Sequence, residues 1–149
     1  MTTTHEIFTA AELEFLGVQR LGRLATVDST GAPQNNPVGF GYNAELGTID
    51  IGGLNMGATR KYRNVWGNPR VALVVDELAS VAPWTVRGVE IRGWAEALDG
   101  QKPAMRGMSG EIIRIHPRRI LSWGVNPGQE GMQARAVAPR LAETSGRVA

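Results

Sequence analysis

The order of hydrophobic and polar positions near the start of the chain is typical of a short amphipathic helix. Thr9 can cap its N-terminus, and Glu12, three residues later, completes a capping box. Phe8 and Leu13 have the spacing of a hydrophobic staple, and Gly17 is a residue type that commonly ends a helix. The pattern therefore predicts a first helix between Thr9 and Gly17.

Beyond this helix, the pattern changes to short β-type runs separated by turns. Residues 23–27 (RLATV) and 33–43 (PQNNPVGFGYN) flank the turn sequence DSTG, and they predict a hairpin. Residues 48–52 (TIDIG) predict a third strand. Because proline cannot donate a ladder hydrogen bond, Pro37 places the second run at a sheet edge or at a bulge.

The second half of the chain continues as strands around one further helix. A glycine-rich loop leads into a helix expected over residues 59–68, with an apolar face that includes Tyr62, Val65 and Trp66. Residues 70–76 (RVALVVD) predict a fully buried strand, because turn residues bound their apolar run. The remaining expected strands are 85–98, whose alternation puts Val89, Ile91, Gly93, Ala95 and Ala97 on one face, and the closing strands 111–117 and 119–125.

Together these patterns predict a mostly β protein with two short helices, in which about six strands form a small barrel. We expect the barrel domain to cover residues 1–125. Residues 126–149 lack apolar periodicity, and we expect them to form a loose C-terminal tail.

Composition narrows the functional classes. The chain has 149 residues, about one domain, and its net charge of +2 gives no support to nucleic-acid binding. The absence of cysteine excludes disulfides and thiolate chemistry. Since there is no apolar run of membrane-spanning length and no signal-peptide pattern, we expect a soluble cytoplasmic protein without a membrane partner. His5 and His116 have no metal-ligand spacing, and no metal is expected.

Two motif matches fail on their context. Gly39, Gly41 and Ala44 formally satisfy a dinucleotide-binding pattern, but they lie inside a predicted strand and lead into a turn rather than a helix. The stretch GMSGE has Glu111 where a hydrolase elbow requires glycine. Neither match predicts a site, and no side chain stands out as a general acid.

The start of the second helix is the strongest candidate for chemistry. Arg60, Lys61 and Arg63 lie where the helix dipole disfavours positive charge. An anion on the free backbone N–H groups would reverse this effect, with Thr59 and the cations converging on it. A solvated basic turn that binds nothing explains the same residues equally well, so the residues alone leave both interpretations open.

The order of the segments also resembles a known family. RLATVDSTGAPQNNPV, TIDIG, ATRKYRNVWGNPRVALVVD and VRGVEIRGWAEAL follow one another as in the pyridoxamine 5′-phosphate oxidase-like split-barrel superfamily, over roughly residues 8–125. The most specific match is the (S/T)-R-K segment before the helix, which implies phosphate binding by Thr59, Arg60 and Lys61. The closing segment IHPRRILSWGV resembles an actinobacterial branch that uses the deazaflavin coenzyme F420.

The resemblance implies a homodimeric, six-stranded split barrel of the FMN-binding type, with the cofactor in the groove between the subunits. It implies that the strand at residues 36–39 lies along a flat cofactor ring, because Gly39 leaves space. Trp123 is expected to wall the ring, Trp84 to reach it from the other subunit, and Asn55 to contact the phosphate or linker. The candidate cofactor-binding residues are Asn36, Pro37, Val38, Gly39, Asn55, Thr59, Arg60, Lys61, Trp84 and Trp123.

An obligate homodimer is expected, because a split barrel of this size leaves its groove open. Trp84, Trp94 and Val89 are expected to supply apolar contact area between the subunits.

Departures from the family pattern bear on the cofactor. The flavin-dependent pyridoxamine phosphate oxidases have an arginine where Asn36 aligns, a lysine near Gly41 and a glutamine near Gly88, and all three are missing here. The resemblance thus implies an F420-dependent oxidoreductase that transfers a hydride from a reduced deazaflavin to an unsaturated hydrophobic small molecule. Two alternatives stay open: an FMN-dependent oxidoreductase of the same fold, and a non-catalytic carrier of a flavin, deazaflavin or haem. The substrate and the proton donor also stay open.

Overall fold

The structure, a computed structural model, describes residues 6–138. In this range the chain forms one antiparallel sheet with two α-helices and a short 3-10 helix. The helices are α1 (Ala10–Val18), η1 (Met56–Ala58) and α2 (Arg60–Gly67). The strands are β1 (Gly22–Val27), β2 (Pro33–Val38), β3 (Gly41–Asn43), β4 (Thr48–Ile51), β5 (Arg70–Val81), β6 (Trp84–Leu98), β7 (Ile112–Trp123) and β8 (Met132–Ala136).

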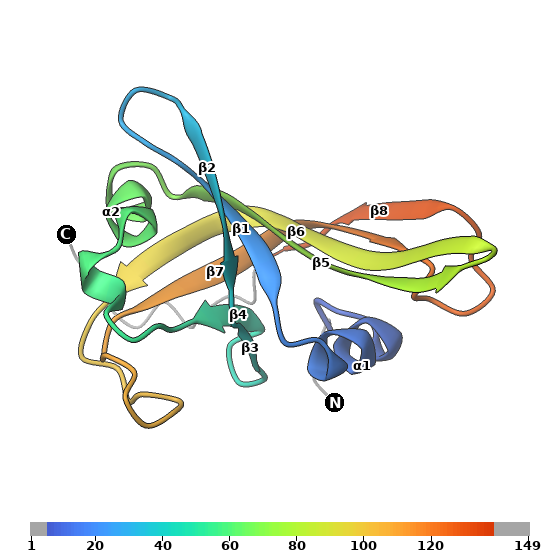
Figure 1. Cartoon of the computed structure of the whole chain (residues 1–149), viewed down its shortest axis with the longest axis horizontal. Helices are drawn as coiled ribbons and strands as arrows, with labels where there is room; N and C mark the ends of the chain where they lie inside the picture. The colour runs from blue at the N-terminus through green and yellow to red at the C-terminus, as the bar shows by residue number, and fades with distance from the viewer. Residues whose placement is uncertain (1–5, 139–149) are drawn as a thin grey trace.

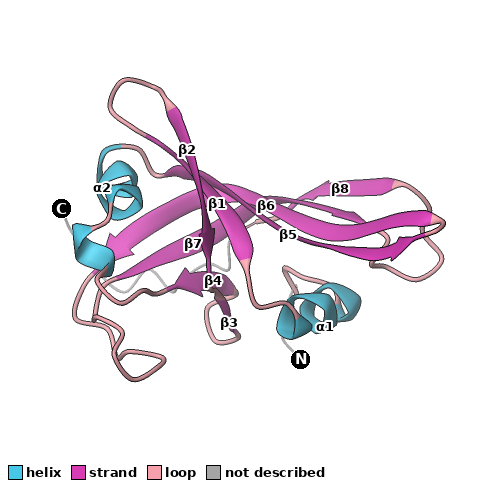
Figure 2. Cartoon of the chain, viewed as in Figure 1, coloured by secondary structure: helices cyan, strands magenta, loops and turns pink. Residues whose placement is uncertain are grey.

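The sheet has the strand order β2-β1-β5-β6-β7-β4-β3, and β8 is added beside β7. Two strands pair with the same edge of β7: β4 pairs with its first half and β8 with its second half. The β5–β6 hairpin, the second half of β7 and β8 extend together as an arm that points away from α2 (Figure 1). Figure 2 shows α2 at the opposite end of the sheet from the β5–β6 turn, and α1 beside the arm.

The predicted capping of α1 is confirmed. Glu12 N–H donates to Thr9 Oγ1 over 3.1 Å, and Thr9 N–H donates back to Glu12 Oε1 over 3.0 Å. The helix ends at Val18, one residue beyond Gly17. No helix in residues 6–138 is long and apolar enough to cross a membrane.

The expected strand over residues 33–43 is two strands at opposite ends of the sheet. β2 pairs with β1, whereas β3 pairs with β4. The chain leaves the sheet at Gly39 and Phe40 to make this crossing. Pro37 lies on β2, which is an edge strand as its missing N–H predicted.

The core lies on one face of the central strands. On β6, Val89, Ile91 and Ala95 are buried as predicted. The expectation that residues 70–76 are fully buried is wrong, because only alternate positions of β5 are buried and its other face is half-buried. The expected role of Val89 in a subunit contact is also wrong, because this side chain is fully enclosed in the core.

The two closing strands expected at 111–117 and 119–125 are a single strand, β7, with a bulge at residue 118. At this bulge a Cβ on Gly93 would lie 2.1 Å from the carbonyl oxygen of His116. Only glycine allows this close backbone approach, so the bulge explains why Gly93 interrupts the apolar face of β6.

The expectation of a loose tail from residue 126 is wrong for the part that the structure describes. β8 pairs with residues 119–123 of β7, and Val137 N–H donates to the carbonyl of Arg118. The strand is short, and it turns Met132, Ala134 and Ala136 to solvent while Gln133 and Arg135 are half-buried. Its sequence therefore lacks the usual pattern of apolar residues on the buried face. The folded domain thus extends past residue 125, and residues 139–149 lie outside the described range.

Candidate functional site

The start of α2 is shaped by Thr59, its N-cap residue. Thr59 Oγ1 accepts the N–H of Tyr62 over 3.3 Å and donates its hydrogen to the carbonyl of Met56 over 2.7 Å. This hydroxyl is engaged in capping, so its hydrogen points to the backbone of η1. The cap fixes where the helix begins, and with it the direction of the first N–H groups.

The first turn of α2 carries positive charge that no salt bridge within residues 6–138 neutralises. The N–H groups of Arg60 and Lys61 have no acceptor among the described residues, as expected for the first positions of a helix. The first turn contains no acidic residue. None of Arg60, Lys61 and Arg63 forms a salt bridge within residues 6–138. The helix dipole and three cations therefore add up to a strongly anion-attracting surface.

A hollow of about 730 Å³ separates α2 from the β1–β2 turn, and Arg60 and Arg63 line it. Asp28 lies on the opposite wall and accepts hydrogen bonds from the hydroxyl and N–H of Thr30 and the N–H of Ala32. These hydrogen bonds lower the pKa of Asp28, and the charge of Arg60 adds to the effect. The Asp28 carboxylate is therefore ionised and hydrogen-bonded to residues of the β1–β2 turn, and it faces the cations of α2 across the hollow.

Buried polar contacts hold α2 against the sheet. Asn64 donates to Thr26 Oγ1 over 3.0 Å and to Gln34 Oε1 over 2.9 Å, and so ties the helix to β1 and β2. The hydroxyl of Tyr62 donates to the carbonyl of Leu98 over 3.1 Å, and burial raises its pKa. The cations thus project from a helix whose position is fixed by the core.

The predicted ring-binding strand lies at the exposed end of β2. Asn36 and Pro37 are exposed, whereas the side chain of Val38 points into the core. A Cβ on Gly39 or Gly41 would meet nothing within 4 Å. The backbone at the end of β2 is therefore accessible. Val38 is enclosed by the core, whereas Gly39, the next residue, leaves open space beside the chain.

Gly39 also lines a second hollow of about 1100 Å³, which we call the large hollow. Its walls are the end of α1, the β2–β3 crossing and the loop that joins β6 to β7. Its lining residues are Gly17, Val18, Gln19, Arg20, Gly39, Phe40, Gly41, Tyr42, Asn43, Ala44, Asp50, Gly52, Gln101, Lys102, Pro103, Ala104, Met105, Met108, Ser109, Ile112 and Arg114.

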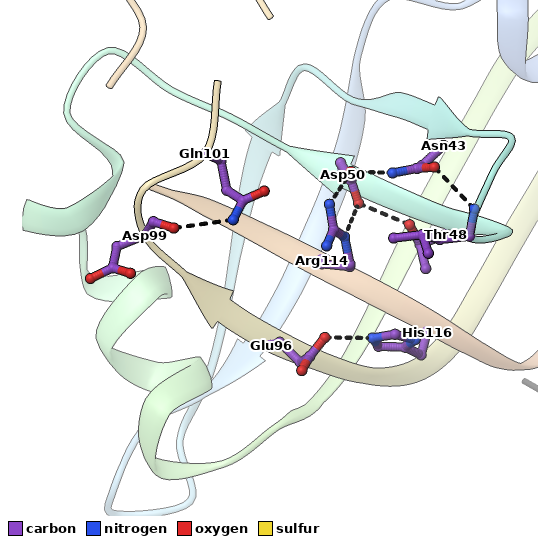
Figure 3. Close-up of polar contacts among 9 residues, drawn as sticks. Asn43, Thr48, Asp50, Glu96, Asp99, Gln101, Arg114 and His116 are labelled. Carbon is purple, nitrogen blue, oxygen red and sulfur yellow. Dashed lines mark hydrogen bonds and ion pairs between the residues drawn. The ribbon is translucent and has the colours of Figure 1, made fainter. Parts of the chain in front are cut away.

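Asn43, Asp50 and Arg114, which line the large hollow, belong to a network of polar contacts that Figure 3 shows. Arg114 donates from Nε and Nη2 to the two carboxylate oxygens of Asp50, each over 3.0 Å, and Asn43 and Thr48 donate to the same carboxylate. Burial would raise the pKa of Asp50, but these hydrogen bonds and the charge of Arg114 outweigh it and lower the pKa. Asp50 and Arg114 therefore form a bidentate ion pair with no net charge.

The two predicted aromatic residues lie on the arm, away from α2. Trp84 is 71% exposed at the β5–β6 turn, and Trp123 ends β7 opposite Gly88. Asn55 is exposed ahead of η1 and makes no side-chain cap hydrogen bond. A single chain thus brings Asn55, Thr59, Arg60 and Lys61 together, and it leaves Trp84 and Trp123 apart from them (Figure 1).

Sequence reasoning missed the large hollow entirely. Asp50 and Arg114 meet only because β4 pairs with β7, and α1 lies far from residues 101–109 in the sequence. Neither feature leaves a local pattern that could have been found. Within residues 6–138, no group of three His, Asp or Glu side chains could hold a metal ion.

Comparison with known proteins extends this picture. The family model described as pyridoxamine 5′-phosphate oxidase matches residues 8–139. The chain is 46% identical over 142 residues to the 5a,11a-dehydrotetracycline/5a,11a-dehydrooxytetracycline reductase of Streptomyces rimosus subsp. rimosus, and the alignment covers 94% of this chain and 98% of that reductase.

Solved structures show the fold. A structure named F420 reductase has a TM-score of 0.59 at 22% identity, covering 76% of this chain and 98% of that one. A heme binding protein from Mycobacterium smegmatis has a TM-score of 0.63 at 17% identity, with 87% of this chain and 59% of that protein covered. The predicted mostly β split barrel with two helices is confirmed, and residues 6–138 form eight strands in place of the expected six. The chain belongs to the pyridoxamine 5′-phosphate oxidase family.

Proposed function

We propose that this protein is an F420-dependent oxidoreductase that reduces an unsaturated, polycyclic small molecule. The observation that carries the proposal is the start of α2. There, within residues 6–138, three cations form no salt bridge and two backbone N–H groups have no acceptor. The similarity to a dehydrotetracycline reductase supports a reductase, and the similarity to an F420 reductase supports a deazaflavin.

The donors at this helix start fit a phosphate group. Arg60 and Lys61 would hold the phosphate with charged hydrogen bonds, together with their own N–H groups. Arg63, which lines the neighbouring hollow, would add a third positive charge. Thr59 would act as the helix cap, since its hydroxyl hydrogen is given to Met56, and Asn55 would border the linker.

The exposed end of β2 would support the flat ring. Asn36 and Pro37 are exposed, Val38 would contribute its backbone only, and Gly39 leaves open space. We expect this strand to orient the ring by its backbone groups, because neither side chain of the two exposed residues carries a charge. The missing basic residues at Asn36 and Gly41 are consistent with a deazaflavin rather than FMN.

The chemistry is a two-electron reduction. When bound, the reduced deazaflavin supplies the hydride. In the substrate, the hydride would add to the β-carbon of a C=C bond conjugated to a carbonyl, and the carbonyl oxygen would take up the electron pair. Protonation of the α-carbon would then complete the saturated bond. The chain's own groups would bind and orient the acceptor and exclude bulk water.

A homodimer would complete the site. Apolar side chains are exposed along the arm at Leu78, Val81, Trp84 and Val86, and Trp84 would reach the cofactor of the other subunit. Trp123 is on the same arm, and Trp94 is partly exposed in a stack with His116. Light scattering at micromolar concentration should give twice the 16.0 kDa monomer mass. A monomer mass would overturn this part of the proposal.

The test of the function uses cofactor choice and turnover together. The protein is titrated with F420 and with FMN, and the oxidation of each reduced cofactor is then followed with 5a,11a-dehydrooxytetracycline, simpler enones and quinones as acceptors. Acceptor-dependent oxidation of reduced F420 is the expected result. Turnover with reduced FMN alone would favour the FMN-dependent alternative. Tight cofactor binding without turnover of any acceptor would favour the non-catalytic carrier.

A further inference from the structure

We infer that the large hollow is the acceptor site, and that it selects a flat polycyclic molecule with a negative charge at one end. This inference rests on the proposed function, because it concerns the second substrate of the same reaction. The large hollow shares Gly39 with the strand end that would support the cofactor ring. A molecule in the hollow would therefore lie beside that ring.

The size and shape of the large hollow suit a fused-ring ligand. Its volume of about 1100 Å³ lies slightly above the usual range for small-molecule sites, so it has room for several fused rings. The end of α1, the β6–β7 loop and the Asp50–Arg114 pair all line it. Four hydrogen bonds to the Asp50 carboxylate hold this pair in place, so this part of the lining is well ordered.

Several apolar side chains that line the large hollow are exposed to solvent, and a ligand would bury them. Val18 at the end of α1 is 72% exposed, and Met105 on the β6–β7 loop is 65% exposed. Both line the large hollow, together with Phe40 and Met108. Methionine adapts its shape to flat ligands, so Met105 is the residue that we expect to set how large an acceptor fits.

The charges at the large hollow favour an anion. Arg114 neutralises Asp50, whereas Arg20 and Lys102 form no salt bridge within residues 6–138. Arg20 comes from the wall at the end of α1 and Lys102 from the wall formed by the β6–β7 loop. We expect an acidic group at one end of the ligand to contact both cations. An ionised enol or carboxylate on a ring system has this chemistry.

The β6–β7 loop is tied to the proposed phosphate site. Ser109 Oγ accepts the N–H of Met56 over 3.0 Å and donates to the carbonyl of Gly53 over 3.2 Å. The carbonyl of Met56 in turn accepts the hydroxyl of Thr59, the cap of α2. The loop that walls the acceptor site and the helix start that would hold phosphate therefore share one rigid connection.

The test measures binding without any cofactor. Anthracene-2-carboxylate and its neutral carboxamide are titrated by fluorescence against the wild-type protein, with oxytetracycline in the presence of a chelator as a full-sized probe. The carboxylate should bind about tenfold more tightly than the carboxamide, as expected for one charged hydrogen bond. Lys102→Ser and Arg20→Ser should each remove most of that preference, and Met105→Ala should weaken both ligands.

Arg106 supplies the matched control, because it is an exposed cation of the same loop that does not line the large hollow. Arg106→Ser should leave the affinities and the carboxylate preference unchanged. Equal affinities of wild type and Lys102→Ser for the carboxylate would overturn the inference. So would equal losses in Lys102→Ser and Arg106→Ser, since that would reflect the overall charge of the loop.

Turnover separates this inference from the proposed function. If the wild type oxidises reduced F420 with an acceptor but Lys102→Ser and Met105→Ala keep its KM, the large hollow is not the acceptor site and the function stands. If the wild type binds the probes with the expected preference but neither binds nor oxidises F420, the function fails and the large hollow is still a site for flat anions.

Discussion

Arg135 of β8 forms a salt bridge with Glu12 of α1, with 2.6 Å between Nη2 and Oε1, and so connects the two ends of the described chain. Glu12 is completely buried, and Asn126 also donates to its carboxylate. Arg135 donates in addition to the carbonyl of Ile7. The segment that looked like a loose tail therefore fastens the first helix to the sheet.

Replacing Arg135 by methionine should destabilise the protein, because it leaves the buried Glu12 carboxylate without its cation. We expect a loss of roughly 3 kcal/mol, at the low end for breaking a buried pair, because Arg135 is itself partly exposed. Urea unfolding of the two proteins measures this. Truncation after residue 128 should be at least as damaging, and a truncated chain of unchanged stability would contradict the role of β8.

The same pair predicts a pH dependence. Burial would raise the pKa of Glu12, but the hydrogen bonds from Arg135, Thr9 and Asn126 and the charge of Arg135 lower it below its ordinary value of 4.5. The stabilisation by the pair is therefore complete above pH 4.5 and is lost as the pH falls through the lowered folded pKa.

In Arg135→Met, burial should raise the pKa of Glu12, because the cation that lowers it is gone. As the pH falls, Glu12 of the variant should become protonated, and the buried charge should no longer destabilise the fold. The stability difference between the two proteins should be large near about pH 7 and should shrink near about pH 4. Other carboxylates cancel in this comparison. A difference that is constant or grows in acid would contradict the account.

The close contact of Trp123 with Gly88 makes a prediction about the arm. A Cβ on Gly88 would lie 2.3 Å from Cζ2 of Trp123, so Gly88→Ala must displace the indole. We expect a loss of about 1–3 kcal/mol, typical of overpacking, with a change in tryptophan emission. Gly39→Ala is the control, because its Cβ meets nothing within 4 Å and should leave stability nearly unchanged.

Removing the cations at α2 should not harm the protein without cofactor. In Arg60→Ala with Lys61→Ala, the loss of positive charge beside a helix N-terminus relieves an unfavourable interaction of about 0.3 to 1 kcal/mol per exposed charge. The melting temperature of the cofactor-free variant should hold or rise. A marked fall would mean that these side chains support the fold rather than a ligand.

The sequence predicted the parts of this structure that are set locally. The capping box at Thr9 and Glu12, the alternation of β6 and the edge position of Pro37 each depend on neighbouring residues, and each was found. The features that it could not predict depend on pairing across the chain. The half-buried face of β8 carries Gln133 and Arg135 rather than apolar residues. The large hollow exists only because β4 meets β7 beside α1.

The candidate site divides in the same way. Thr59 and Arg60 were identified from a short motif. The structure adds that, within residues 6–138, the first N–H groups there have no acceptor and the cations form no salt bridge. Trp84 and Trp123 could be linked to that motif only through the family resemblance. They lie on the arm, and their proposed role requires a second copy of the chain.

The central claim is that the start of α2 binds the phosphate of a deazaflavin, and its most direct test is a fluorescence titration of the cofactor-free protein with F420. Wild type is compared with the Arg60→Ala, Lys61→Ala double variant. Each lost charged hydrogen bond to phosphate should cost about 1.5–3 kcal/mol, so the dissociation constant of the variant should rise by at least about a hundredfold. Equal dissociation constants for the two proteins would contradict the claim.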